Sequence, residues 1–270
     1  MKKKFKLGVI GCGFMASAII RGAVLSDFLN AKKIIVSDLN EENLNKINEI
    51  GVFTCTSNRF VAENSEYVLF AVKPQNFNAV ISSLGGYKPE KVISVMAGVG
   101  KKIIKSGLGS MDIKVARSMP NLPCSIGSGA VGLDMSDYDG NEDDTEFLFN
   151  IFDKLGVVLS IDESKMNAVT GISGSGPAYV FMFLDGLIDA GVREGLTLEE
   201  SKSLATQTVL GAAEMVLRDD KPLSDLIMSV CSKGGTTIEA VKVLEKNNFR
   251  KSIVKAVDAC VKKAEDLSKI

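Results

Sequence analysis

The sequence predicts an α/β protein in which a doubly wound, mostly parallel sheet is followed by an all-α domain. Up to about residue 161, short runs rich in Val, Ile and Leu alternate with helical patterns. The runs are continuous, without polar residues at every second position, which is typical of parallel strands covered on both faces. After residue 161 the strand patterns stop and helical periodicity remains. We therefore expect one domain at residues 1–161 and a helical domain at residues 162–270.

The expected elements follow from these patterns. Strands are predicted at Lys6–Ile10, Lys33–Asp38, Tyr67–Val72, Val92–Ala97, Lys114–Ser118 and Gly129–Leu133, with helices at Phe14–Leu25 and Glu41–Glu49. The second domain is expected to contain helices at Val180–Ala190, Leu198–Leu217, Ser224–Val230, Ile238–Lys246 and Phe249–Ser268. Thr197 followed by Glu200 resembles a capping box at the start of the helix 198–217.

Composition excludes several classes of function. The chain has no histidine, so neither a Ser-His-Asp triad nor a His-ligated zinc can form, and we expect no metal site. The net charge is −1, without the basic excess of a nucleic-acid-binding surface. The five cysteines form no CxxC pair, which indicates reduced thiols and a cytoplasmic protein.

The N-terminal apolar run has two interpretations. MKKKF followed by LGVIGCGFMASAII resembles a signal peptide, with a basic start, an apolar run and small residues. The same segment fits a buried strand, a glycine turn and a helix. We favour this second interpretation because a signal peptide does not need Gly11 and Gly13. No other apolar run is long enough to span a membrane, so no membrane partner is expected.

The turn Gly11–Ala16 follows a predicted strand and opens a predicted helix, which is the context of a dinucleotide-binding motif. Gly11 permits the tight turn, Gly13 lets a pyrophosphate approach the backbone, and Ala16 lets the helix pack closely on the strand. Free N–H groups at the helix N-terminus favour an anion. Asp38 ends the second strand, where an acid can bind a ribose hydroxyl. An isolated motif of this kind can be an ordinary turn, but the combination predicts a Rossmann-like domain.

Ligands of such sheets bind at the carboxyl ends of the strands, so we expect the cofactor there. The expected cofactor-binding residues are Gly11, Gly13, Phe14, Met15, Ala16, Ser37, Asp38, Asn58, Ala71, Val72, Lys73, Pro74, Ala97 and Gly98. Asn58 can also be a helix N-cap, and Lys73 can be a solvated loop lysine. Cys12 is either a reactive thiolate favoured by the helix N-terminus or a buried, inert thiol.

Two further helix entrances are rich in glycine. In the first, Ser173–Pro177, Pro177 suits the first helical turn and Ser175 or Gly176 can cap it, while a hinge between helices is an equally simple interpretation. In the second, Gly234, Gly235, Thr236 and Thr237 precede Ile238. Their consecutive N–H groups and hydroxyls predict an anion nest for a carboxylate, although an elaborate helix cap has the same pattern.

Six segments resemble, in order and spacing, motifs of the pyrroline-5-carboxylate reductase family: LGVIGCGFMASAI, LFAVKP, MAGV, SMPNLP, VTGISGSGPAYVF and GGTTIEAVKVLE. The resemblance covers essentially the whole chain, and the last two segments are specific to the family. It implies hydride transfer from NADPH or NADH to the C=N bond of 1-pyrroline-5-carboxylate, which gives L-proline in the last step of proline synthesis.

The resemblance also implies roles for individual residues and a mode of assembly. The implied substrate-binding residues are Ser175, Ser232, Gly234, Gly235, Thr236 and Thr237, with the Thr237 hydroxyl as the catalytic contact to the ring nitrogen. Lys233 departs from the family pattern, because a proline usually precedes the two glycines. Family members are dimers or larger, which implies a homo-oligomer formed through the helical domain.

Two other functions and the choice of cofactor remain open at this point. A β-hydroxyacid dehydrogenase needs a lysine with an asparagine one turn later, but Val169 follows Lys165 at that distance. A non-enzymatic nucleotide sensor would explain the first glycine turn and leave the third unused. Asp38 favours NADH, and no arginine follows it in the turn 36–40. We expect NADP and NAD both to be usable, with NADH better here than in relatives that carry a base in this turn.

Overall fold

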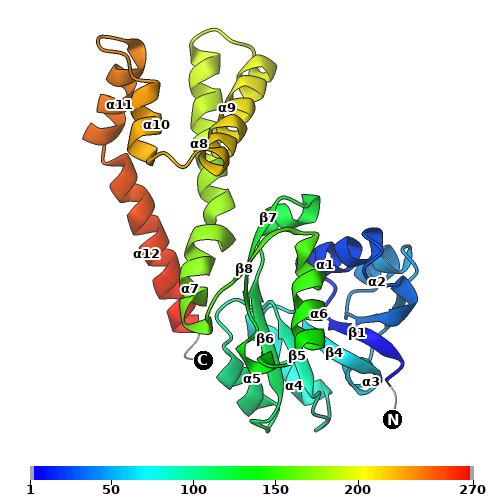
Figure 1. Ribbon diagram of the computed structural model, residues 1–270. Helices are drawn as coiled ribbons and strands as arrows, with labels where there is room; N and C mark the ends of the chain where they lie inside the picture. Colours follow the sequence, from blue (N-terminus) through cyan, green and yellow to red (C-terminus); the bar gives the residue numbers. More distant parts are fainter. Residues whose placement is uncertain (1–2, 268–270) are drawn as a thin grey trace. The chain divides into compact units, whose positions relative to one another are not determined.

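The computed structural model describes residues 3–267, which form two compact units (Figure 1). The first unit contains the residues up to Ser175 together with those from Ala259 onward, and the second is Gly176–Asp258. The two compact units are divided after Ser175. The boundary predicted after residue 161 concerns the roles of the two domains and stays a prediction. Each unit is described by itself.

An eight-stranded sheet forms the first unit, in the order β3-β2-β1-β4-β5-β6-β7-β8. The strands are β1 (Phe5–Ile10), β2 (Ile34–Ser37), β3 (Phe53–Cys55), β4 (Ser65–Phe70), β5 (Lys91–Ser94), β6 (Lys114–Met119), β7 (Gly129–Asp134) and β8 (Gly156–Ser160). All neighbours are parallel except β6 and β7. The segment between β6 and β7 is too short for a crossover helix, so the chain turns back there. The predicted doubly wound, mostly parallel sheet is confirmed.

Helices cover both faces of the sheet and enclose two apolar cores. One face carries α1 (Phe14–Leu25), α2 (Glu41–Asn48) and α6 (Glu142–Asp153), and the other carries α3 (Asn58–Asn64), α4 (Phe77–Ser83) and α5 (Lys101–Gly107). The sequence patterns did not single out α3 to α6, β3 or β8. β3 has only three residues, too few for a clear pattern. β8 contains a short apolar run, residues 157–159, which the sequence prediction did not assign to a strand.

The chain leaves β8 through a short helical segment that belongs to the first unit. It consists of a 3₁₀ turn (Glu163–Lys165), α7 (Met166–Val169) and a π turn (Thr170–Gly174). α8 (Gly176–Arg193) starts one residue later, with Pro177 in its first turn as predicted. Ser175, one of the two residues predicted as a possible cap of this helix, closes the π turn, because its N–H donates to the Thr170 carbonyl at 2.9 Å.

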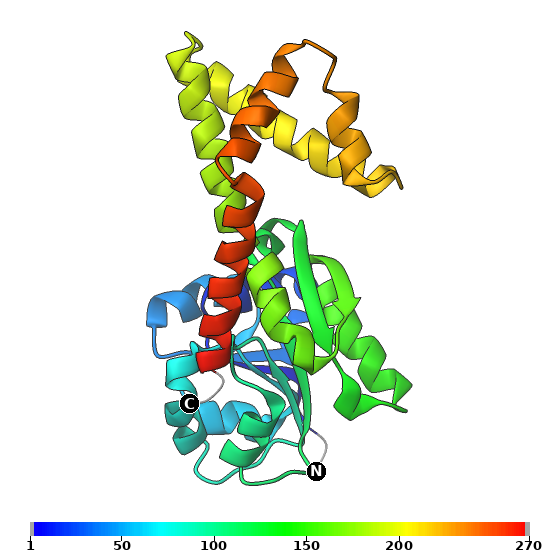
Figure 2. The same cartoon turned by 90° about the vertical axis from the view of Figure 1, so that its left-hand side faces the viewer.

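The second unit consists of helices alone (Figure 2). They are α8, α9 (Leu198–Arg218), α10 (Leu223–Ser229), α11 (Thr236–Lys246) and the first part of α12 (Phe249–Leu267). The capping box of Thr197 and Glu200 is present at the start of α9, as predicted. Ser268, the predicted last residue of α12, lies outside the described residues. Within residues 3–267, no helix is both long and apolar enough to cross a membrane.

Candidate functional site

The glycine turn between β1 and α1 is held tightly against β4. Gly11 has φ +94°, and a Cβ at this position would lie 2.8 Å from the Ala71 carbonyl oxygen, so only glycine fits. Gly13 is the N-cap of α1 without a side-chain cap, and a Cβ there would meet nothing within 4 Å. The backbone at the N-terminus of α1 is therefore open to an incoming group. The positive end of the helix dipole makes this a place for an anion.

A cleft of about 830 Å³ begins at this turn and runs along the carboxyl ends of β1, β2 and β4. We call it the β1–β4 cleft. Its lining includes eight of the predicted cofactor residues: Gly11, Gly13, Ser37, Asp38, Asn58, Ala71, Val72 and Lys73. The strand order reverses between β1 and β4, which is where open α/β sheets bind their ligands. The volume lies in the range of small-molecule sites.

The carboxylate of Asp38 accepts backbone hydrogen bonds from the glycine turn and from the turn after β2. It accepts hydrogen bonds from the N–H of Cys12 at 2.5 Å and from the N–H of Asn40 at 2.7 Å. Asp38 therefore joins the glycine turn to the turn after β2. Asn40 caps α2, because its side chain accepts from the Glu42 N–H. The negative charge of Asp38 is partly balanced by these two donors, which moderates its effect on a ligand phosphate.

Three polar side chains that line the cleft, those of Ser37, Asn58 and Ser83, are joined by hydrogen bonds. The Ser37 hydroxyl donates to the Asn58 side-chain oxygen at 2.7 Å, and the Asn58 amide donates to the Ser83 hydroxyl at 2.9 Å. Asn58 is the first residue of α3, and the N-cap is Ser57, so the interpretation of Asn58 as an N-cap is wrong. Its side chain is free to line the cleft because Ser57 already satisfies the first turn of the helix.

The loop that opens α11, which we call the α11 loop (Ser232–Thr237), forms a turn before the helix N-terminus, and the carboxylate nest there stays a prediction. The Gly235 N–H donates to the Ser232 carbonyl at 3.0 Å, and Gly234 has φ +74°, which together make a type II turn. Gly235 is the N-cap of α11, without a side-chain cap, and a Cβ on it would collide with the Ser232 hydroxyl. The helix begins at Thr236, two residues before the predicted start, so Thr236 and Thr237 contribute first-turn N–H groups.

Comparisons with known proteins agree over the whole chain. A family model described as "Pyrroline-5-carboxylate reductase dimerisation" matches residues 163–267, and one described as "NADP oxidoreductase coenzyme F420-dependent" matches residues 6–98. Relatives named pyrroline-5-carboxylate reductase include that of Arabidopsis thaliana, 38% identical and covering 98% of this chain and 96% of the relative. The Escherichia coli (strain K12) protein is 36% identical and covers 98% of both.

A solved structure has the same fold. The pyrroline carboxylate reductase of Plasmodium falciparum with NADP bound matches with a TM-score of 0.89 and 31% identity, over 99% of this chain and 100% of that one. The chain belongs to the pyrroline-5-carboxylate reductase family. It is therefore an NAD(P)-dependent oxidoreductase, and the dehydrogenase and nucleotide-sensor alternatives are no longer needed.

Ser175 follows Gly174, which packs against Met119, the last residue of β6. The π turn packs there because Gly174 leaves no side chain between it and Met119, where a Cβ would lie 2.6 Å from the Met119 methyl. The Ser175 hydroxyl is 3.0 Å from the Cys260 sulfur of α12. π turns of this kind often occur at functional sites in proteins.

Six predicted cofactor residues do not line the β1–β4 cleft. They are Phe14, Met15, Ala16, Pro74, Ala97 and Gly98. Ala16 is fully buried between α1 and the sheet, which is the packing role predicted for a small residue. Gly98, with φ +74°, lies under the end of α12, where a Cβ would be 2.9 Å from the Cβ of Leu267. Asn76, in the turn before α4, and Ala79 and Ser83 of α4 also line the cleft, and they were missed because only tertiary contacts bring them there.

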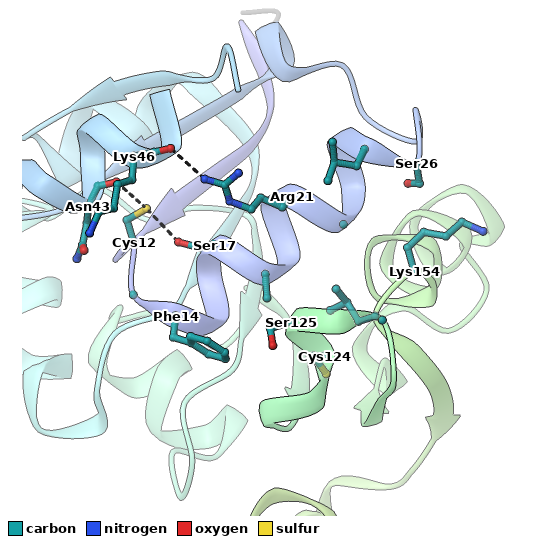
Figure 3. A pocket seen from close by; sticks show the side chains of 16 residues that line it. Cys12, Phe14, Ser17, Arg21, Ser26, Asn43, Lys46, Cys124, Ser125 and Lys154 are labelled. Carbon is teal, nitrogen blue, oxygen red and sulfur yellow. Dashed lines mark hydrogen bonds between the residues drawn. The ribbon is translucent and has the colours of Figure 1, made fainter. Parts of the chain in front are cut away.

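Phe14 and Cys12 belong to a second cavity of about 670 Å³, which runs along the outer side of α1 (Figure 3). Cys12 is buried, and its sulfur lies 3.8 Å from the Asn43 carbonyl and 3.9 Å from the Ser17 hydroxyl. Burial, together with the charge of Asp38, raises the pKa of Cys12, although the Ser17 hydroxyl and Arg21 oppose this shift. The structure shows that the Cys12 thiol is buried, and burial favours the thiol over the thiolate.

Proposed function

We propose that the protein reduces 1-pyrroline-5-carboxylate to L-proline by hydride transfer from NADPH or NADH. Family membership over nearly the full length, together with a cleft placed at the strand-order reversal, supports this most strongly. The dinucleotide's adenosine half lies in the β1–β4 cleft, with its pyrophosphate at the N-terminus of α1. The nicotinamide half then continues past Gly13 toward the ends of β5 and β6.

The substrate carboxylate is proposed to bind the N–H groups of the α11 loop. Thr236 and Thr237 present consecutive first-turn backbone donors at a helix end that has no side-chain cap, whereas the Gly235 N–H is already bonded to the Ser232 carbonyl. The Ser232 hydroxyl, folded against Gly235, and the Thr237 hydroxyl add two more donors or acceptors. Ser175 is proposed to contact the substrate from the edge of the sheet.

The reaction needs few catalytic side chains. A protonated imine is already a strong electrophile, so the main task of the protein is to orient the nicotinamide against the imine carbon. The chain has no histidine, which agrees with this requirement. The Thr237 hydroxyl is proposed to contact the ring nitrogen, and the α11 loop neutralises the carboxylate.

The helical unit is proposed to form a homodimer or a larger homo-oligomer, and residues 162–270 are proposed as the substrate-binding and dimerisation domain. Of residues 176–258, all of which the structure describes, only Ser201 and Ala205 are buried. Large apolar side chains are exposed on every helix, including Met182, Leu204 and Leu217. A unit of this size without a core needs an apolar partner surface, and a second copy of the same unit provides one. A cytoplasmic location is proposed because all five cysteines are free thiols.

An assay of the purified protein tests the proposed activity. With 1-pyrroline-5-carboxylate and NADPH or NADH, absorbance at the reduced nicotinamide band should fall and L-proline should appear in equal amounts. Nicotinamide oxidation without proline, or no oxidation with either cofactor, would refute the proposal.

Light scattering after size-exclusion chromatography tests the assembly. The protein should elute as a dimer or a multiple of a dimer. Leu210→Glu, on the exposed apolar side of α9, should shift it toward a monomer. A wild-type monomer would contradict the proposed interface.

A further inference from the structure

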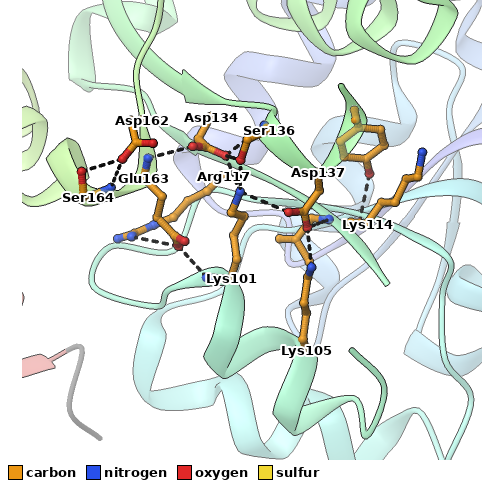
Figure 4. A network of polar contacts seen from close by, with 12 residues as sticks. Lys101, Lys105, Lys114, Arg117, Asp134, Ser136, Asp137, Asp162, Glu163 and Ser164 are labelled. Atoms are coloured by element: carbon orange, nitrogen blue, oxygen red, sulfur yellow. Dashed lines mark hydrogen bonds and ion pairs between the residues drawn. The ribbon is translucent and has the colours of Figure 1, made fainter. Parts of the chain in front are cut away.

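Buried charges connect the end of β7 to the start of α5 and to the segment after β8 (Figure 4). The Lys101 ammonium donates to Asp134 at 2.5 Å and to the Ser136 hydroxyl at 2.6 Å. Asp137 lies 3.3 Å from the same ammonium and 2.7 Å from that of Lys105. Lys101 is only 8% exposed and Asp134 only 3%, so this is an interior network, unlike a surface ion pair.

Glu163 ties the backbone of α5 into this network. Its carboxylate accepts a hydrogen bond from the Lys101 N–H at 2.6 Å, while its own N–H donates to Asp134 at 2.7 Å. The N-cap residue Gly100 has no side chain, so Glu163, from a distant part of the sequence, takes the place of the missing cap. The same oxygen lies 3.5 Å from the guanidinium of Arg117, which is buried. Burial lowers the pKa of Arg117 and Glu163 opposes that shift.

The capped end of α5 also fixes the loop that precedes it, residues 95–100, which we call the β5–α5 loop. Gly98 in this loop has φ +74° and is seated under Ala264 and Leu267 of α12. The loop is thus held from both sides, by α12 and by Glu163. It leaves the carboxyl end of β5, next in the sheet after β4, so it lies beyond the β1–β4 cleft along the sheet edge.

We propose that Glu163 is a positioning residue that holds the β5–α5 loop for the nicotinamide half of the cofactor, a proposal that rests on the cofactor placement given above. Glu163 acts through the Lys101 N–H and does not touch the cofactor. Without the Glu163 carboxylate, one end of the β5–α5 loop is no longer fixed. The nicotinamide half then loses a rigid contact surface, while the β1–β4 cleft that binds the adenosine half is unchanged. A misplacement of about 1 Å is sufficient to weaken a positioned group strongly.

The test measures the binding of two ligands to three Glu163 variants and to one control variant. NADPH reports both halves of the cofactor, and adenosine 2′,5′-bisphosphate reports the adenosine half alone. Glu163→Ala removes the acceptor, Glu163→Asp keeps the charge near Arg117 but shortens the side chain, and Glu163→Gln keeps an acceptor of the same length. Asp137→Asn is the matched control, because it removes a carboxylate of the same network and leaves the Lys101 N–H bonded to Glu163.

In Glu163→Ala and Glu163→Asp, we expect the dissociation constant of NADPH to rise about tenfold, because the loop no longer positions the nicotinamide half, and that of the bisphosphate to change less than about twofold. Glu163→Gln should restore most of the NADPH affinity, and Asp137→Asn should lower thermal stability without changing either affinity. Equal weakening of both ligands, or unchanged NADPH affinity in Glu163→Asp, would overturn the proposal. Turnover of 1-pyrroline-5-carboxylate by the wild type is measured in parallel. If the wild type is active, either of these outcomes counts against the role of Glu163 and not against the proposed function.

Discussion

The carboxylate of Asp38 accepts a hydrogen bond from the backbone N–H of Cys12, 2.5 Å away, and so couples the end of β2 to the glycine turn. The same carboxylate receives the Asn40 N–H at 2.7 Å. The acid that we propose discriminates between cofactors is thus also a structural part of the turn that we propose holds the pyrophosphate. Substitutions at Asp38 will therefore change both the cofactor preference and the structure of the glycine turn, and a control variant separates the two effects.

We predict that Asp38→Ser shifts the cofactor preference toward NADPH. The 2′-phosphate of NADPH would no longer face a carboxylate, and removing about 1.4 kcal/mol of repulsion changes a ratio about tenfold. The KM of both cofactors should rise, because the Cys12 and Asn40 N–H groups lose their acceptor. The measurement is the ratio of kcat/KM for NADPH and NADH. Glu41→Gln, another carboxylate that lines the cleft, is the control. An unmoved ratio in Asp38→Ser would remove Asp38 from cofactor selection.

Thr237→Ala should reduce kcat/KM for 1-pyrroline-5-carboxylate about ten- to a hundredfold, the cost of one hydrogen bond to a charged group of about 1.5–3 kcal/mol. Thr237→Ser keeps the hydroxyl and should retain most activity. NADPH affinity should be nearly unchanged in both variants. Normal steady-state kinetics in Thr237→Ala would show that its hydroxyl does not contact the substrate.

Lys233 occupies the second position of the type II turn that forms the α11 loop, where proline is favoured. Lys233→Pro should stabilise the protein by about 0.4–1 kcal/mol by restricting the unfolded chain. It should also lower the KM for the substrate, because the N–H groups are held in place before binding. Lys233→Ala tests whether the charge matters instead. A lower melting temperature for Lys233→Pro would contradict the turn assignment.

Cys12 should react slowly with alkylating reagents at neutral pH, with or without bound nucleotide. The thiol is buried and its raised pKa keeps it protonated. Mass spectrometry of the alkylated protein should show modification first at partly exposed cysteines such as Cys55, Cys231 and Cys260. Rapid labelling of Cys12 that nucleotide prevents would restore the interpretation as a reactive thiolate.

Asp144 should make stability depend on pH in the acid range. Burial alone would raise its pKa, but hydrogen bonds from Lys91, at 2.5 Å, and from Tyr67 outweigh this, so its pKa is lowered in the folded protein. The stabilisation is fully present above the unfolded pKa of about 3.9 and is lost as the pH falls through the lower folded pKa. The difference in melting temperature between the wild type and Asp144→Asn should therefore be large at pH 7 and shrink toward pH 3. A difference that is constant with pH would exclude this linkage.

The sequence by itself determined the parts of the molecule that depend on local pattern. Continuous apolar runs identified six of the eight strands, and the glycine turn after the first strand identified the open end of α1. Gly234 and Gly235 identified the turn before α11, because Gly234 has positive φ and a Cβ on Gly235 would collide with the Ser232 hydroxyl. Motif order along the chain was sufficient to indicate the family, which the comparisons then showed.

Only the tertiary structure decided which residues meet, because contacts between distant segments leave no periodic signal. Local pattern placed Gly98 with the cofactor residues, but the fold seats it under α12. Nothing near Asn58 indicated Ser83, and nothing near Lys101 indicated that its N–H is capped by Glu163. Cys12 shows the physical reason most clearly. A helix N-terminus alone would favour its thiolate, and burial by the surrounding elements reverses that preference.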